Sequence, residues 1–206
     1  PYNPVKFFGI QYWEVYRVSQ KQASPAPLGL AAFAMTTTAL SLFILGLLPA
    51  DGIGVVIPLA IAYGGIIQVL VGYWEWKSGN TFGLVAFTSY GAFWLYYAML
   101  NLFAGWGFLS LNPAAAGTVL ILWGFFTFYL WIASLRTNLT TSLVFFFLWL
   151  AFILLGLGDI TGSRLIVMGG GIIALITAAA AWYNSLAIVI NETYGKVVIP
   201  LGKAPK

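Results

Sequence analysis

The residues that could do chemistry in this chain are hydroxyl and amide side chains set within long apolar stretches. They are Thr36, Thr37, Thr38, Ser41, Gln68, Thr88, Ser89, Tyr90, Asn101, Thr127 and Asn184. Such groups can line a pore for a small polar or weakly charged solute, because they hydrogen-bond to it without carrying a full charge. They can equally bond back to their own helix or tie two helices together. The pattern alone leaves both interpretations open.

Several chemistries are excluded by residues that the chain lacks. It has no cysteine and no histidine, which removes disulfides, thiol nucleophiles, imidazole bases and most transition-metal sites. The apolar stretches contain no Asp, Glu, Lys or Arg, the side chains that usually mark proton relays and ion-coupled pumps. We therefore expect no enzyme activity, no cofactor and no metal ion.

A short proline-rich segment precedes the first apolar stretch. Residues 24–30 read SPAPLGL, in which Ser24 would cap a helix and Pro25 would occupy its first position. The free amides that follow form a positive helix end suited to a carboxylate. Gly29 would let a ligand or a neighbouring helix approach the backbone. Taken alone, the segment is also typical of a plain helix start.

The elements that must position these residues are transmembrane helices. Hydrophobic residues make up 61% of the 206 residues and charged residues only 7%, against about 25% charged in soluble domains. Apolar runs of roughly 20 residues match the hydrocarbon layer, and a helix satisfies its own backbone polar groups there. We predict an all-α integral membrane protein with six spans, at residues 28–48, 53–74, 82–104, 115–135, 143–157 and 165–190.

The positions of the basic residues predict the orientation in the membrane. A cytoplasmic N-terminus leaves only Arg164 outside and places the remaining basic residues inside, namely Lys6, Arg17, Lys21, Lys77, Arg136, Lys196, Lys203 and Lys206. This asymmetry follows the positive-inside rule, so we expect both termini to be cytoplasmic in a multi-pass protein of the cell membrane. The basic residues behind the net charge of +4 therefore fix the orientation of the protein among the membrane lipids. We expect no nucleic-acid partner.

Three regions are expected along the chain. In residues 1–23, aromatic and aliphatic side chains alternate with charged ones, which is typical of an amphipathic segment lying in the membrane interface. Residues 24–202 form the six-helix transmembrane domain, and residues 203–206 form a C-terminal tail.

Several motifs together carry a family resemblance. SPAPLGL, followed by Phe33, Met35, Thr36 and Thr37, is similar to the NPAPLGL signature of the acetate uptake transporter family, which includes the bacterial acetate/succinate permeases of the YaaH type. The similarity continues through Tyr63-Gly64-Gly65, Gln68, EWKSGNTFG at 75–83, AFTSYGAFWL at 86–95, Leu122-Trp123-Gly124 with Thr127, and the tail at 191–202. Ser24 departs from the family's Asn and lacks its amide donor.

The resemblance implies a homohexamer in which each protomer holds its own path for acetate and, in some members, succinate. It also implies an apolar constriction formed by a Phe after the first motif, a Tyr in TSYG and a Leu in the fifth helix. In this sequence those positions are Phe33, Tyr90 and Leu148.

We expect acetate to be captured at the helix opening, with Thr37 and Gln68 as further substrate-binding residues and Glu75 at the cytoplasmic mouth. The residues of the opening are Ser24, Pro25, Ala26, Pro27, Leu28 and Gly29. Apolar side chains penalise a bare anion. The penalty falls if acetic acid carries its own proton or if Tyr90 hydrogen-bonds the carboxylate. Two alternatives remain: a membrane sensor or structural protein without flux, and a channel for another small solute.

Overall fold

The computed structural model describes residues 5–7, 10–12 and 22–205, most of which are helical. Five long helices are α1 (Ala26–Ile44), α4 (Thr81–Gly105), α5 (Pro113–Ser134), α6 (Leu139–Thr161) and α7 (Arg164–Tyr194). Between α1 and α4 runs a continuous helical segment made of η1 (Ala50–Val55), α2 (Val56–Leu59), η2 (Ala60–Ile67) and α3 (Gln68–Lys77). Of these, η1 is a 3₁₀ helix and η2 is a π-helix.

Asparagine side chains start three of the helices. Asn80, Asn112 and Asn138 accept backbone N–H bonds at the starts of α4, α5 and α6, at 3.1, 3.1 and 2.8 Å. Each bond satisfies an amide that has no partner within its helix. At α1 the prediction is wrong by one residue, because Pro25 occupies the cap position and no side chain caps the helix. Pro27 lies in the first turn, where a missing N–H costs nothing.

Five of the helical segments in the described chain are long and apolar enough to cross a membrane: α1, the 50–77 segment, α5, α6 and α7. The chain is therefore a multi-pass helical membrane protein. The predicted third span corresponds to α4, which has 25 residues but is not among the five. Its Thr, Ser, Tyr and Asn side chains lower its hydropathy.

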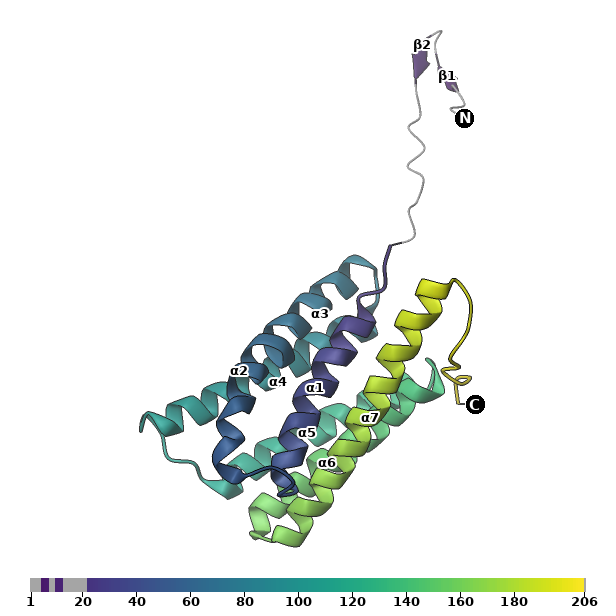
Figure 1. Ribbon diagram of the computed structural model, residues 1–206. Coiled ribbons are helices and arrows are strands. Elements are labelled where there is room, and N and C mark those ends of the chain that lie inside the picture. The colour runs from purple at the N-terminus through teal and green to yellow at the C-terminus, as the bar shows by residue number, and fades with distance from the viewer. Residues whose placement is uncertain (1–4, 8–9, 13–21, 206) are drawn as a thin grey trace.

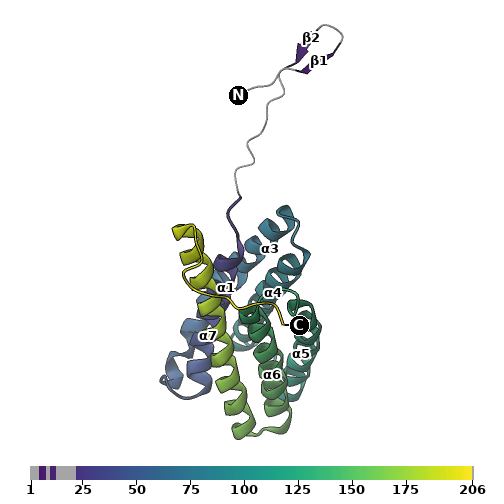
Figure 2. The ribbon, with the colours of Figure 1, turned by 90° about the vertical axis from the view of Figure 1, so that its right-hand side faces the viewer.

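The helices run along a common direction and form one bundle (Figure 1). Helix α6 packs against both α5 and α7, α1 packs against α7, and α4 packs against α3 and η2. The backbones of α4 and α5 come close at few points. The start of α1 and the end of α7 lie at the same end of the bundle in both views (Figures 1 and 2).

Glycines allow close approach between α5 and α6. A Cβ atom on Gly156 would lie 2.6 Å from the carbonyl oxygen of Gly117, and one on Gly117 would lie 2.5 Å from that of Gly156. Helices in lipid associate through such close backbone contacts, because lipid supplies no hydrophobic force to bring them together.

The segment after α7 folds back onto the bundle. The Asn191 side chain accepts from the N–H groups of Val198 and Ile199 at 2.7 and 2.9 Å. The carbonyl oxygen of Leu201 accepts from both the backbone N–H and the hydroxyl of Thr140, at 3.1 and 2.8 Å. These bonds fix the segment against α6 and α7.

The N-terminal part of the chain contains a short antiparallel hairpin of β1 (Val5–Phe7) and β2 (Ile10–Tyr12), in which Lys6 pairs with Gln11. The predicted interfacial segment at residues 1–23 otherwise lies almost entirely outside the described residues. Its placement in the membrane interface stays a prediction.

Candidate functional site

Two cavities lie at opposite ends of the helix bundle. The smaller cavity, of about 210 Å³, is lined near the start of α1, the end of α3, the starts of α4 and α6, and the last third of α7. The larger cavity, of about 420 Å³, is lined near the end of α1, η1, the end of α4, the start of α5, the end of α6 and the start of α7. Phe33 and Leu148 line both cavities, so these two side chains stand where the cavities meet.

The three residues predicted to form the constriction come together at this junction. Phe33, Tyr90 and Leu148 are 7%, 4% and 5% exposed and belong to one buried apolar cluster. The ring centroids of Phe33 and Tyr90 are 6.1 Å apart. Tyr90 lines the smaller cavity, beside Phe145 and Leu148 of α6. Apolar side chains from α1, α4 and α6 therefore separate the two cavities.

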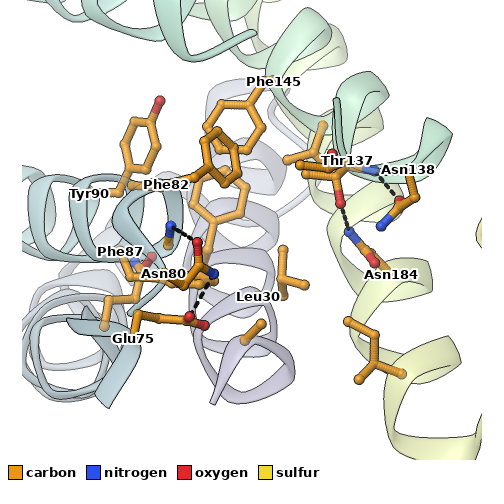
Figure 3. Close-up of a pocket in the computed structure, with 18 of the residues that line it drawn as sticks. Leu30, Glu75, Asn80, Phe82, Phe87, Tyr90, Thr137, Asn138, Phe145 and Asn184 are labelled. Atoms are coloured by element: carbon orange, nitrogen blue, oxygen red, sulfur yellow. Dashed lines mark hydrogen bonds between the residues drawn. The ribbon is translucent and has the colours of Figure 1, made fainter. Parts of the chain in front are cut away.

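The hydroxyl of Tyr90 is directed toward α5 and bonds there. It donates to the hydroxyl oxygen of Thr127 at 2.9 Å, and the Thr127 hydroxyl donates to the carbonyl oxygen of Trp123 at 2.7 Å. In Figure 3 this hydroxyl points away from Glu75, Asn80 and Asn184. In this structure the aromatic ring of Tyr90 therefore lines the cavity, and its hydroxyl proton is hydrogen-bonded to Thr127.

The larger cavity carries spare hydrogen-bond donors. The hydroxyls of Thr37 and Ser41 and the indole Nε1 of Trp94 are buried and have no partner within the described chain. All three residues line this cavity and are at most 6% exposed. An indole N–H donates only and a hydroxyl can donate, so these groups are candidate donors to a carboxylate, with each polar atom itself buried in the cavity wall.

The smaller cavity carries spare acceptors instead. Gln68 donates its amide N–H to the carbonyl oxygen of Gly64 in the π-helix at 2.6 Å, which leaves its Oε1 without a partner in the described residues. Asn184 likewise donates to the hydroxyl of Thr141 at 2.8 Å (Figure 3), and its Oδ1 has no partner among residues 22–205. The predicted binding residue Gln68 thus lines a cavity, on the opposite side of the constriction from Thr37.

Glu75 lies in the wall of the smaller cavity, 2% exposed. One carboxylate oxygen accepts from the Asn80 side chain at 2.7 Å, and the other has no hydrogen-bond partner in the described part of the chain. Lys77, two residues away, lies over the rings of Tyr73 and Trp76 at 5.3 and 5.4 Å. The predicted span ended at residue 74, but helix α3 runs on to Lys77 and buries Glu75.

The SPAPLGL segment contributes less to the cavities than predicted. Of its six predicted binding residues, only Ala26 lines either cavity. Gly29 serves packing, because a Cβ atom there would lie 2.5 Å from the ring of Phe87. The Pro27 carbonyl accepts from Ser185 of α7 at 2.7 Å, and Leu28 is 37% exposed. Ser24, Pro25, Pro27 and Leu28 thus lie away from both cavities.

Sequence reasoning missed several residues of the site. Trp94 and Asn80 sit inside motifs that carried the family resemblance, yet neither was singled out. The predicted fifth span ended at residue 157, but α6 runs on to Thr161 and places Asp159 in the wall of the larger cavity. An aspartate between glycine-rich residues gives no local signal that separates a helix end from a turn.

Known proteins resemble most of this chain in sequence and in fold. The pattern of the GPR1/FUN34/yaaH family matches residues 12–206. The succinate-acetate/proton symporter SatP of Escherichia coli is 42% identical over 185 residues, covering 89% of this chain and 97% of that protein. Acetate permease A of Emericella nidulans is 37% identical over 203 residues, covering 91% of this chain and 68% of that protein.

A solved structure, described as that of the bacterial acetate channel SatP, superposes with a TM-score of 0.85 at 42% identity. The match covers 88% of this chain and 100% of that one. The predicted resemblance to the acetate transporters is thereby confirmed, and the chain belongs to the GPR1/FUN34/yaaH family.

Proposed function

We propose that this protein transports acetate, and succinate or other small carboxylates, through a path inside each protomer. The observation that carries the proposal is the pair of cavities that open at opposite ends of the bundle and meet at Phe33 and Leu148. The names of the relatives, a succinate-acetate/proton symporter and an acetate permease, support the substrate class. In this proposal Phe33, Tyr90 and Leu148 form the constriction that selects the solute.

The chemistry of the two cavities favours acetic acid as the species that crosses the constriction. A bare carboxylate loses its hydration among apolar side chains, which costs on the order of several kcal/mol after the protein relaxes. The spare donors of Thr37, Ser41 and Trp94 suit the anion in the larger cavity. The spare acceptors of Gln68 and Asn184 suit a solute that still carries its proton in the smaller cavity. Because the Tyr90 hydroxyl proton is bonded to Thr127, Tyr90 does not neutralise the carboxylate, and the solute's own proton does so instead.

The same proposal includes the topology and the assembly. We take α4 as a sixth span, so that both termini face the cytoplasm, and we place the smaller cavity with Glu75 on that side. A hexamer in the cell membrane is expected from the family resemblance, and many large apolar side chains on the bundle surface are available for lipid and neighbouring subunits. Single-cysteine labelling can test the topology, because the chain has no cysteine of its own. Native mass spectrometry measures the subunit number.

The test of function is radiolabelled acetate uptake by the purified protein in liposomes. We expect saturable uptake that exceeds that of protein-free liposomes and that succinate competes for. Measuring uptake at two pH values, with and without a membrane potential, distinguishes the forms of transport. Uptake of the neutral acid depends on pH and not on potential, whereas a channel for the anion responds to potential. Uptake equal to that of protein-free liposomes under all four conditions would reject transport and favour a sensor or structural role.

A further inference from the structure

We infer that Thr127 is a positioning residue that holds the hydroxyl of Tyr90 out of the transport path, so that the constriction shows the solute an aromatic ring and no hydrogen-bonding group. The inference rests on the proposed function, because it assigns a specificity role at the same constriction. Thr127 lies on α5, is fully buried, and lines neither cavity.

The direction of the hydrogen bonds follows from counting protons. A threonine hydroxyl has one proton, and that of Thr127 goes to the carbonyl oxygen of Trp123 at 2.7 Å. The 2.9 Å contact between Tyr90 and Thr127 must then use the proton of Tyr90. Thr127 is thus an acceptor for Tyr90, and the Tyr90 proton is not available to a passing carboxylate.

The aromatic side chains that contact the Tyr90 ring offer no substitute acceptor. Its ring contacts five aromatic side chains at centroid distances of 5.7 to 6.5 Å. They are Phe33, Trp123, Phe126, Phe145 and Phe152. None of these side chains has an oxygen, and an indole N–H only donates. Without the Thr127 hydroxyl, we expect the Tyr90 side chain to turn its hydroxyl toward the smaller cavity, which Tyr90 already lines.

The hydrogen bond between Tyr90 and Thr127 joins two helices at the constriction. Tyr90 lies on α4 and Thr127 on α5, two helices whose backbones come close at few points and whose side chains meet mainly through aromatic rings. The bond therefore links the two helices at the level of the constriction. Other buried threonines, such as Thr36 and Thr177, bond only to their own helix among the hydrogen bonds of the described residues.

The test replaces Thr127 with valine, which keeps the shape and removes the acceptor. Liposome flux is measured for propionate and glycolate, which are similar in size and differ by a methyl against a hydroxyl group. Wild-type protein should favour propionate. In Thr127→Val the freed Tyr90 hydroxyl should shift the glycolate-to-propionate ratio upward by about fivefold, the equilibrium worth of one hydrogen bond.

Three further variants separate positioning from a general disturbance. Thr127→Ser keeps the acceptor and should restore the wild-type ratio. Thr118→Val, at an exposed threonine on the same helix that bonds to its own helix, should leave the ratio unchanged. In a Tyr90→Phe background, Thr127→Val should have no effect, because no hydroxyl is left to release. An equal shift in that background would overturn the inference, as would an unchanged ratio in Thr127→Val.

Failure of the proposed function gives a different result. It would appear as absence of flux for every carboxylate in the wild type, before any variant is compared. In that event a cryo-EM structure of Thr127→Val still decides the inference. We expect the Tyr90 hydroxyl to move into the smaller cavity, and a side chain that keeps its present position would contradict the assignment.

Discussion

Replacing Phe33 with alanine should open the constriction. The Phe33 side chain stands where cavities of about 210 and 420 Å³ meet, and its ring lies 6.1 Å from that of Tyr90. Removing the ring would join the two cavities into one conduit. Leu148 and Tyr90 would remain as a partial barrier, so we expect the variant to lose discrimination by size while it keeps its preference for carboxylates.

The size of the effect follows from how Phe33 is packed. Phe→Ala substitutions in cores cost about 3–5 kcal/mol of stability, and loss of an aromatic pair contributes about 0.5–1.5 kcal/mol. We expect a cost near the low end, about 3 kcal/mol, because Phe33 borders open space on two sides. A barrier change of only about 1.4 kcal/mol for the larger solute alters its relative flux tenfold.

The assay compares butyrate with acetate flux in liposomes, together with thermal unfolding of the same preparations. We expect the butyrate-to-acetate ratio to rise at least about tenfold in Phe33→Ala. Phe125→Ala is the matched control, because Phe125 is 71% exposed and lines neither cavity. A folded Phe33→Ala protein with wild-type selectivity would refute the idea that this ring guards the path.

Three further predictions concern the cavity walls and the helix packing. Glu75→Gln should raise acetate flux at pH 7 by about tenfold, since it keeps the oxygen that Asn80 bonds and removes a repelling charge; a tenfold fall would show that the carboxyl group itself is required. Trp94→Phe should raise the KM for acetate about tenfold with little change in kcat, through loss of a free donor in the larger cavity; an unchanged KM counts against a carboxylate there. Gly156→Ala should destabilise the protein by about 1–3 kcal/mol in thermal unfolding, while Gly169→Ala, with nothing within 4 Å of its Cβ, should not; equal melting temperatures would contradict the α5–α6 contact.

Much of the helical architecture could be predicted from simple physics. Apolar runs of membrane length predicted the helices, and α5 begins at Pro113, two residues before the predicted span. The ends were harder, because the predicted spans stopped at polar residues. Glu75 and Asp159 lie within α3 and α6, where they face cavities that hydropathy cannot reveal. The π-helical η2 also has no sequence signal that distinguishes it from an ordinary helix.

Some residues of the site could be predicted from the sequence, and others could not. The positions of Phe33, Tyr90 and Leu148 came from the family resemblance, since nothing in the pattern of apolar residues separates them from the other core side chains. Substrate binding by the SPAPLGL segment stays a prediction, because a helix start with free amides resembles an anion site whether or not a cavity adjoins it. The bond between Tyr90 and Thr127 joins residues 37 positions apart, and only the fold brings them together.

A path through the protomer that passes the constriction can be tested most directly by blocking it at Leu148. The chain has no cysteine, so Leu148→Cys creates a single thiol. The Leu148 side chain that it replaces is 5% exposed and lines both cavities. Leu122→Cys, at a 63% exposed position outside both cavities, is the control. We predict that a small thiol-reactive reagent abolishes acetate flux through Leu148→Cys and spares the control. Full labelling of Leu148→Cys with undiminished acetate flux would contradict the account.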